Sequence, residues 1–129
     1  MITHAGARTR ALYSWEETDI QHRDGIKRIN DITDYRNIAD QLGFSVPKIE
    51  IHPGVHYYPF CEGRTRIVMT GTNNFNYTFI HELAHFDRGG TSKNCHTVGF
   101  VRKYIRLLVR YFGWDEEELL LQAHWRGFV

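Results

Sequence analysis

The sequence predicts an α+β domain, and three patterns along its 129 residues support this fold class. Apolar residues recur at helical spacing in three separate segments, and the region between the first two of these segments contains short runs typical of strands. Apolar residues make up 42% of the chain, which is enough for one hydrophobic core. We therefore predict a single domain over residues 1–129, in which a small mixed or antiparallel sheet packs against helices.

The first half of the chain is predicted to hold one helix followed by short strands. Residues 1–10 show no pattern and are expected to form a loose end, and the segment Ala11–Asp19 fits either a short strand or a helical turn. A helix is expected over Asp31–Leu42, because its apolar residues fall on one face and Gly43 can end it. Strands are expected over residues 46–52, 55–60 and 66–70.

Three helices are predicted for the second half of the chain. Apolar residues at helical spacing begin at Phe75, nearby Asn and Thr side chains can cap this helix, and Gly89-Gly90 can stop it. A second helix is expected over Val98–Phe112, where the apolar residues form a one-sided stripe. The final segment, Asp115–Ala123, is expected to pack as a C-terminal helix.

The first of these helices carries the string His81-Glu82-Leu83-Ala84-His85. Residues four apart on a helix lie about 5–6 Å apart at Cβ, so both imidazoles can reach one metal ion, for which Zn²⁺ is the leading candidate. Glu82 follows the first histidine and points beside the metal, where it can act as general base toward metal-bound water. The alternative is a buried helix with two hydrogen-bonded histidines and a surface glutamate.

A third ligand is expected, because a catalytic zinc usually takes three protein ligands and leaves a fourth position to water. We select His96, which follows His85 after ten intervening residues and opens the amphipathic helix that would hold it in place. Glu116, Glu117 and Glu118 are the rival, although acidic residues in a first helical turn are explained by the helix dipole. Cys95 adjoins His96 and could compete as a ligand, but packing is the favoured role of this thiol.

The residues around the motif resemble a known family. The metzincin pattern H-E-x-x-H-x-x-G-x-x-H is not met, since Arg88 and Thr91 occupy its last two fixed positions. Residues 66–112 instead resemble the SprT-like zinc metalloproteases and small phage-type metallohydrolases, through the HExxH helix, a glycine-containing loop and His96-Thr-Val-Gly-Phe100. The last element keeps an H-x-x-x-F spacing, with Thr and Val where the usual H-G-P-x-F form has Gly and Pro. The resemblance implies a minimal zincin-like fold, Zn²⁺ held by His81, His85 and His96, and Glu82 as general base.

These residues predict a zinc-dependent hydrolase, most simply a metallopeptidase that cleaves a protein or peptide substrate. The strand at residues 66–70 could be an open edge that binds an extended peptide, as the resemblance implies, or an ordinary interior strand. The residue that would stabilise the oxyanion stays open among Tyr57, Tyr58, Tyr77, His56 and Arg102.

Two other functions are alternatives. Arg102, Arg106 and Arg110, with Lys103 beside them, form a basic face on the Val98–Phe112 helix, and SprT-like proteases act on DNA-bound proteins. The protein could therefore be a zinc-binding nucleic-acid-associated protein, although such a stripe is usually the solvated side of an amphipathic helix. The second alternative is a catalytically inert metal-binding module, which keeps the three histidines but lacks a cleft or an oxyanion donor.

The composition sets further limits. A net charge of +1 with both signs mixed argues against a dedicated nucleic-acid binder. Residues 1–10 lack the apolar core of a signal peptide and no apolar run is long enough to span a membrane, so a cytoplasmic protein is expected. The two cysteines, Cys61 and Cys95, are expected to be reduced thiols.

Overall fold

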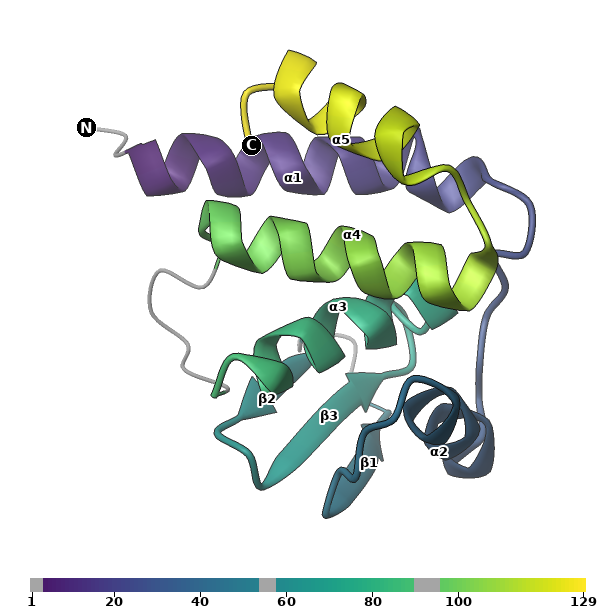
Figure 1. Ribbon diagram of the computed structural model, residues 1–129. Helices are drawn as coiled ribbons and strands as arrows, with labels where there is room; N and C mark the ends of the chain where they lie inside the picture. Colours follow the sequence, from purple (N-terminus) through teal and green to yellow (C-terminus); the bar gives the residue numbers. More distant parts are fainter. Residues whose placement is uncertain (1–3, 54–57, 90–95) are drawn as a thin grey trace.

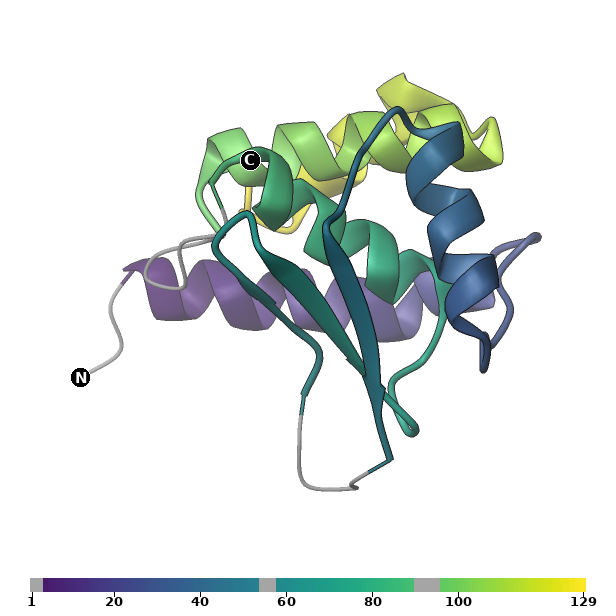
Figure 2. The same ribbon diagram turned by 90° about the horizontal axis from the view of Figure 1, so that it is seen from below.

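The computed structural model describes residues 4–53, 58–89 and 96–129 and shows an α+β domain, as the sequence predicts. Figures 1 and 2 show α1 and α4 running in the same direction, with α3 between α4 and the sheet. Among the described helices, none is both long and apolar enough to cross a membrane. The elements in chain order are α1 (His4–Thr18), η1 (Ile20–His22), α2 (Ile32–Gln41), β1 (Lys48–His52), β2 (Phe60–Glu62), β3 (Arg66–Thr70), α3 (Asn76–Asp87), α4 (Val98–Phe112) and α5 (Glu116–Trp125).

The three strands form one mixed sheet in the order β1-β3-β2. β1 pairs with β3 in parallel, with Lys48 opposite Arg66, whereas β2 pairs with β3 antiparallel, with Glu62 opposite the same arginine. β3 is therefore the central strand, and the interpretation of residues 66–70 as an open edge is wrong. In the described part of the chain, the edge strand next to α3 is β2.

The predicted strand at residues 55–60 is wrong in its limits, because the described strand starts only at Phe60 and ends at Glu62. Residues 54–57 lie outside the described part of the chain. A tight turn fixes the position of β2: Thr65 N donates to Glu62 O at 3.1 Å, and Gly63 takes the positive φ of 54° that the turn requires. The strand is therefore placed by its turn to β3 rather than by its own apolar pattern.

α1 is the largest departure from the sequence prediction. Residues 4–10, expected to be loose, and Ala11–Asp19, left open between strand and helix, contribute instead to one helix of 15 residues ending at Thr18. Leu12 and Trp15 on this helix are fully buried, and Trp15 Nε1 donates a 2.8 Å hydrogen bond to Gln122 Oε1 of α5. α1 is therefore stabilised by contacts with segments that are distant in the sequence, and its own residues show no clear helical pattern.

Helices α2, α3, α4 and α5 confirm the predicted segments, with one difference at the start of α3, whereas η1 was not predicted. Asp31, Thr97 and Asp115 cap α2, α4 and α5 with their side chains. α3 has Phe75 at its N-cap with no side-chain cap, although Asn and Thr caps were expected. Asn76 N instead donates to Lys27 O at 3.0 Å. A neighbouring segment of chain therefore fixes where the HExxH helix begins.

α3 is buried on nearly all sides, because it packs against the sheet, α2 and α4. Leu83, at its centre, is fully buried, and Leu83→Ala is expected to lower the free energy of unfolding by about 2–5 kcal/mol through the cavity it leaves. Leu121→Ala is the matched control, since Leu121 is 57% exposed on α5 and should change this free energy by less than about 0.5 kcal/mol. Urea denaturation followed by circular dichroism measures both, and equal effects would contradict the packing.

Candidate metal centre

α3 and the residues that lead into α4 bring three histidines together. One ring nitrogen from each of His81, His85 and His96 lies within 4.8 Å of the other two, and the Nε2 atoms of His81 and His96 are 3.1 Å apart. The three residues selected from the sequence as metal ligands therefore face one another. The rival carboxylates at 116–118 begin α5, where Glu118 pairs with Arg23 at 2.8 Å, and Cys95 lies outside the described residues.

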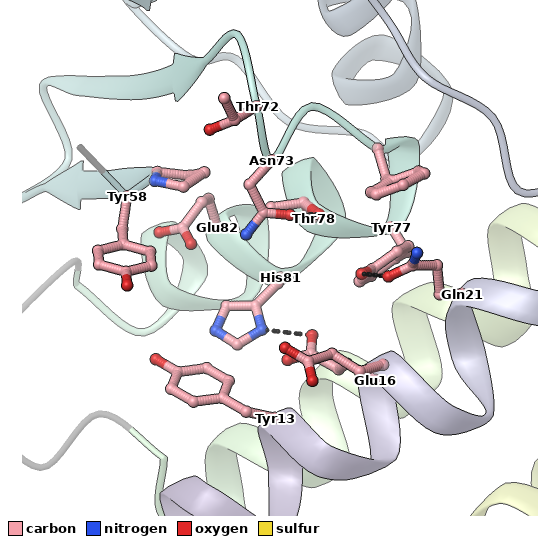
Figure 3. A pocket seen from close by; sticks show the side chains of 13 residues that line it. Tyr13, Glu16, Gln21, Tyr58, Thr72, Asn73, Tyr77, Thr78, His81 and Glu82 are labelled. Atoms are coloured by element: carbon pink, nitrogen blue, oxygen red, sulfur yellow. Dashed lines mark hydrogen bonds and ion pairs between the residues drawn. The ribbon is translucent and has the colours of Figure 1, made fainter. Parts of the chain in front are cut away.

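The far side of two of these rings is hydrogen-bonded to α1. His81 Nδ1 lies 2.8 Å from Glu16 Oε2, and His96 Nδ1 lies 3.1 Å from Thr9 Oγ1. Figure 3 shows the bond between Glu16 and His81, with the carboxylate reaching up from α1. Because Nδ1 of each ring is engaged in this way, the Nε2 atoms of His81 and His96 point toward each other.

Burial keeps two of the three histidines unprotonated. Burial first, and the charge of His81 second, lower the pKa of His85 to about 2 and that of His96 to about 3. Burial opposes protonation of His81 as well, but the charge of Glu16 and its hydrogen bond outweigh this effect and raise the pKa of His81. The cluster therefore offers two imidazoles whose protonation is opposed by burial, and a third whose basicity is increased by Glu16.

Glu82 lies beside the histidine cluster and turns toward the pocket in Figure 3. Its side chain is buried, and this burial raises its pKa to about 7, although the charge of His81 acts in the opposite direction. A carboxyl group with a pKa near neutrality can both accept and return a proton at physiological pH. Glu82 therefore combines a place in the pocket wall next to His81 with a pKa near neutrality.

A pocket of about 660 Å³ opens beside His81 and Glu82. This volume lies within the range of about 300–1,000 Å³ that is typical of ligand sites. Its walls come from α1, η1, the residues before β2, the β3–α3 loop and the first turns of α3, as Figure 3 shows. The other lining residues are Tyr13, Glu16, Glu17, Gln21, Tyr58, Pro59, Thr72, Asn73, Phe75, Tyr77 and Thr78.

Two of the five residues left open as oxyanion donors line this pocket. Tyr77 is buried and its hydroxyl donates to Gln21 Oε1 at 3.2 Å, whereas Tyr58 is 82% exposed at the rim. Arg102 is exposed on α4 and does not line the pocket, and residues 56 and 57 lie outside the described part of the chain.

Tyr13 is a further aromatic residue at the site, and it was not predicted from the sequence. Its ring centroid lies 5.4 Å from that of His96 and 6.2 Å from that of His81, and its side chain is 46% exposed in the pocket wall. The one sequence signal that could have found it is the placement of Thr9, Tyr13 and Glu16 on one face of a helix. This shared face can be inferred only if residues 9–16 are first predicted to be helical, and they were not.

The basic residues of α4 are partly used inside the protein. Lys103 Nζ lies 3.1 Å from Asp87 Oδ2, and Arg110 donates to Leu42 O at 3.3 Å. Arg102 and Arg106 are exposed. This arrangement is that of an ordinary solvated helix face with two anchoring contacts, and it adds no support for a nucleic-acid surface.

Comparison with protein-family models, with curated proteins and with solved structures gives no significant match for this chain. The resemblance to SprT-like proteases therefore stays a prediction from the sequence, and the function has to be argued from the site itself.

Proposed function

We propose that the protein is a zinc-dependent hydrolase with a minimal zincin-like domain, most specifically a metallopeptidase that acts on a protein or peptide substrate in the cytoplasm. His81, His85 and His96 would hold Zn²⁺, and Glu82 would act as general base. The observation that carries the proposal is the convergence of three imidazole nitrogens within 4.8 Å of one another, beside a buried carboxyl group and an open pocket.

The donor set fits zinc. Neutral imidazole nitrogens are preferred ligands of Zn²⁺, and a three-histidine site leaves a fourth position for water or substrate. The Nε2 atoms of His81 and His96, 3.1 Å apart, would repel each other through their lone pairs unless a proton or a cation lies between them. A shared divalent cation satisfies both nitrogens at once. When bound, zinc supplies Lewis acidity and lowers the pKa of water to about 7.

Residues of the chain would carry out proton transfer and substrate binding. Glu82 would take the proton of the attacking water and return it to the leaving nitrogen, which its pKa of about 7 supports. The edge of β2 could pair with an extended peptide by strand addition, because among the described strands β2 pairs only with β3. The pocket beside Glu82 would then receive a substrate side chain.

Metal content and cleavage test the proposal together. Elemental analysis of the protein without a histidine tag is expected to give about one zinc per chain, as a three-histidine site requires. A peptide library derived from proteins, analysed by mass spectrometry, is expected to show cleavage that stops after chelation and returns with zinc. No zinc after reloading at neutral pH would overturn the proposal. Zinc without cleavage would favour the inert metal-binding module.

A further inference from the structure

One face of α1 carries polar side chains toward the histidine cluster. Thr9 and Glu16 lie seven residues apart, so they share this face with two helical turns between them. Thr9 Oγ1 is 3.1 Å from His96 Nδ1, and Glu16 Oε2 is 2.8 Å from His81 Nδ1. A single helix therefore contacts two of the three candidate ligands, each on the ring nitrogen that faces away from the centre of the cluster.

Glu16 is itself held by a second buried group. The same carboxylate oxygen that meets His81 accepts a 2.6 Å hydrogen bond from the hydroxyl of Tyr104 on α4. Glu16 is 7% exposed and Tyr104 is fully buried. A buried carboxylate is strongly unfavourable unless it is paired and hydrogen-bonded, and these two partners provide that compensation. The hydrogen bonds from Tyr104 to Glu16 and between Glu16 and His81 thus fix the imidazole through its Nδ1 atom.

Anchoring of α1 does not explain this carboxylate. Leu12 and Trp15 already attach the helix to the core, and Trp15 also packs against Phe128 and bonds to Gln122. An apolar residue at position 16 would fill the same space without the desolvation of a charge. The carboxylate is explained if Nε2 of His81 binds a cation, because Glu16 then orients the ring through Nδ1.

We propose that Glu16 is a positioning residue of the metal centre, which is oriented by Tyr104 and acts through His81. Thr9 has the corresponding role for His96. This inference rests on the proposed zinc site. A carboxylate at Nδ1 holds the proton on that nitrogen, leaves the lone pair on Nε2, fixes the orientation of the ring and increases the basicity of the ligand.

Glu16→Gln tests this role. Glutamine keeps the length of the side chain and can accept the bond from Tyr104, but it loses the charge and can present an N–H group to His81 Nδ1, which favours the wrong tautomer. We expect zinc affinity to fall by about 10–100-fold, measured by competition with a chromogenic chelator. The visible absorption of the Co²⁺-loaded protein is expected to shift as well, which a change in folding stability alone would not cause.

Two further variants complete the experiment. Glu117→Gln is the matched control, since it removes the same charge from an exposed residue of α5 that does not line the pocket, and it should leave zinc affinity and the Co²⁺ spectrum as in the parent. Tyr104→Phe keeps the ring and removes only the hydroxyl that orients Glu16. It is expected to lower zinc affinity in the same direction as Glu16→Gln, by a smaller factor.

The outcomes separate this inference from the proposed function. If the parent binds neither Zn²⁺ nor Co²⁺, both are overturned. If the parent binds and Glu16→Gln keeps the parental affinity and spectrum, the positioning role is overturned and the zinc site stands. If Glu16→Gln fails to fold, as judged by circular dichroism, Tyr104→Phe decides the role of Glu16, and Thr9→Val decides that of Thr9. In each case reduced affinity supports the role and parental affinity overturns it.

Discussion

Glu82→Gln is expected to abolish hydrolysis and to leave zinc bound. The amide cannot accept the proton of the attacking water, and loss of a general base typically lowers the rate by about 10²–10⁴-fold. The metal should stay, because the three histidines keep their positions and Glu82 is not one of the grouped ligand residues. Turnover of a cleaved library peptide and zinc content, measured on the same preparation, check both halves of this expectation.

The pH profile gives a second measure of the same residue. Glu82 has to be ionised to act as a base, and burial raises its pKa to about 7, so activity is expected to rise with pH as the carboxyl group loses its proton. A cation on the neighbouring histidines favours the ionised form, so this acid limb should lie below pH 7 in the zinc-loaded protein. Glu117→Gln, on the exposed face of α5, is the control and should keep the parental profile. Parental turnover in Glu82→Gln would exclude the base role.

His96→Ala is expected to have the largest effect on metal binding. Removing one of three ligands should weaken zinc binding by more than the roughly 10–100-fold that changes behind a ligand produce. His124→Ala is the matched control, because His124 is exposed in the last turn of α5. Elemental analysis after dialysis against buffered zinc is expected to show a metal-depleted His96→Ala and a fully loaded His124→Ala.

Thermal unfolding provides an independent readout of the same substitution. A ligand that binds only the folded state at 100 times its Kd stabilises that state by about 2.7 kcal/mol, so zinc should raise the Tm of the parent and of His124→Ala. The Tm of His96→Ala should respond far less at the same zinc concentration. An equal rise in all three proteins would mean that His96 is not a ligand.

The parts of the fold that the sequence predicted are those determined by short-range patterns. The one-sided apolar stripe of α4 and the strand over Arg66–Thr70 lie where periodicity and turn residues place them. The three histidines were found for the same reason, because two share a helix face and the third follows one loop later. The proposed general base, Glu82, was selected from its place in the motif.

The parts that were missed depend on contacts between distant segments. The hydrogen bonds from α1 to the site join residues 65 and 87 positions apart, so no local window contains both partners. Trp15 and Leu12 are buried by such distant neighbours, and α1 therefore lacks the simple stripe that marks α4. The parallel pairing of β1 with β3 also joins segments that are separated along the chain, and a strand's own residues do not state whether it is central or at an edge.

The contact between Thr9 and His96 has a practical consequence for anyone who prepares this protein. α1 begins at His4, so Thr9 is about 8 Å along the helix axis from its first residue at 1.5 Å per residue. A purification tag of consecutive histidines fused ahead of α1 would hold spare imidazoles within reach of the cluster, where they could supply a foreign ligand and inflate the apparent zinc content. The C-terminal residues return from α5 to α1 in Figure 1, where Phe128 is buried against Trp15, so zinc content is best measured after a tag at either end has been removed.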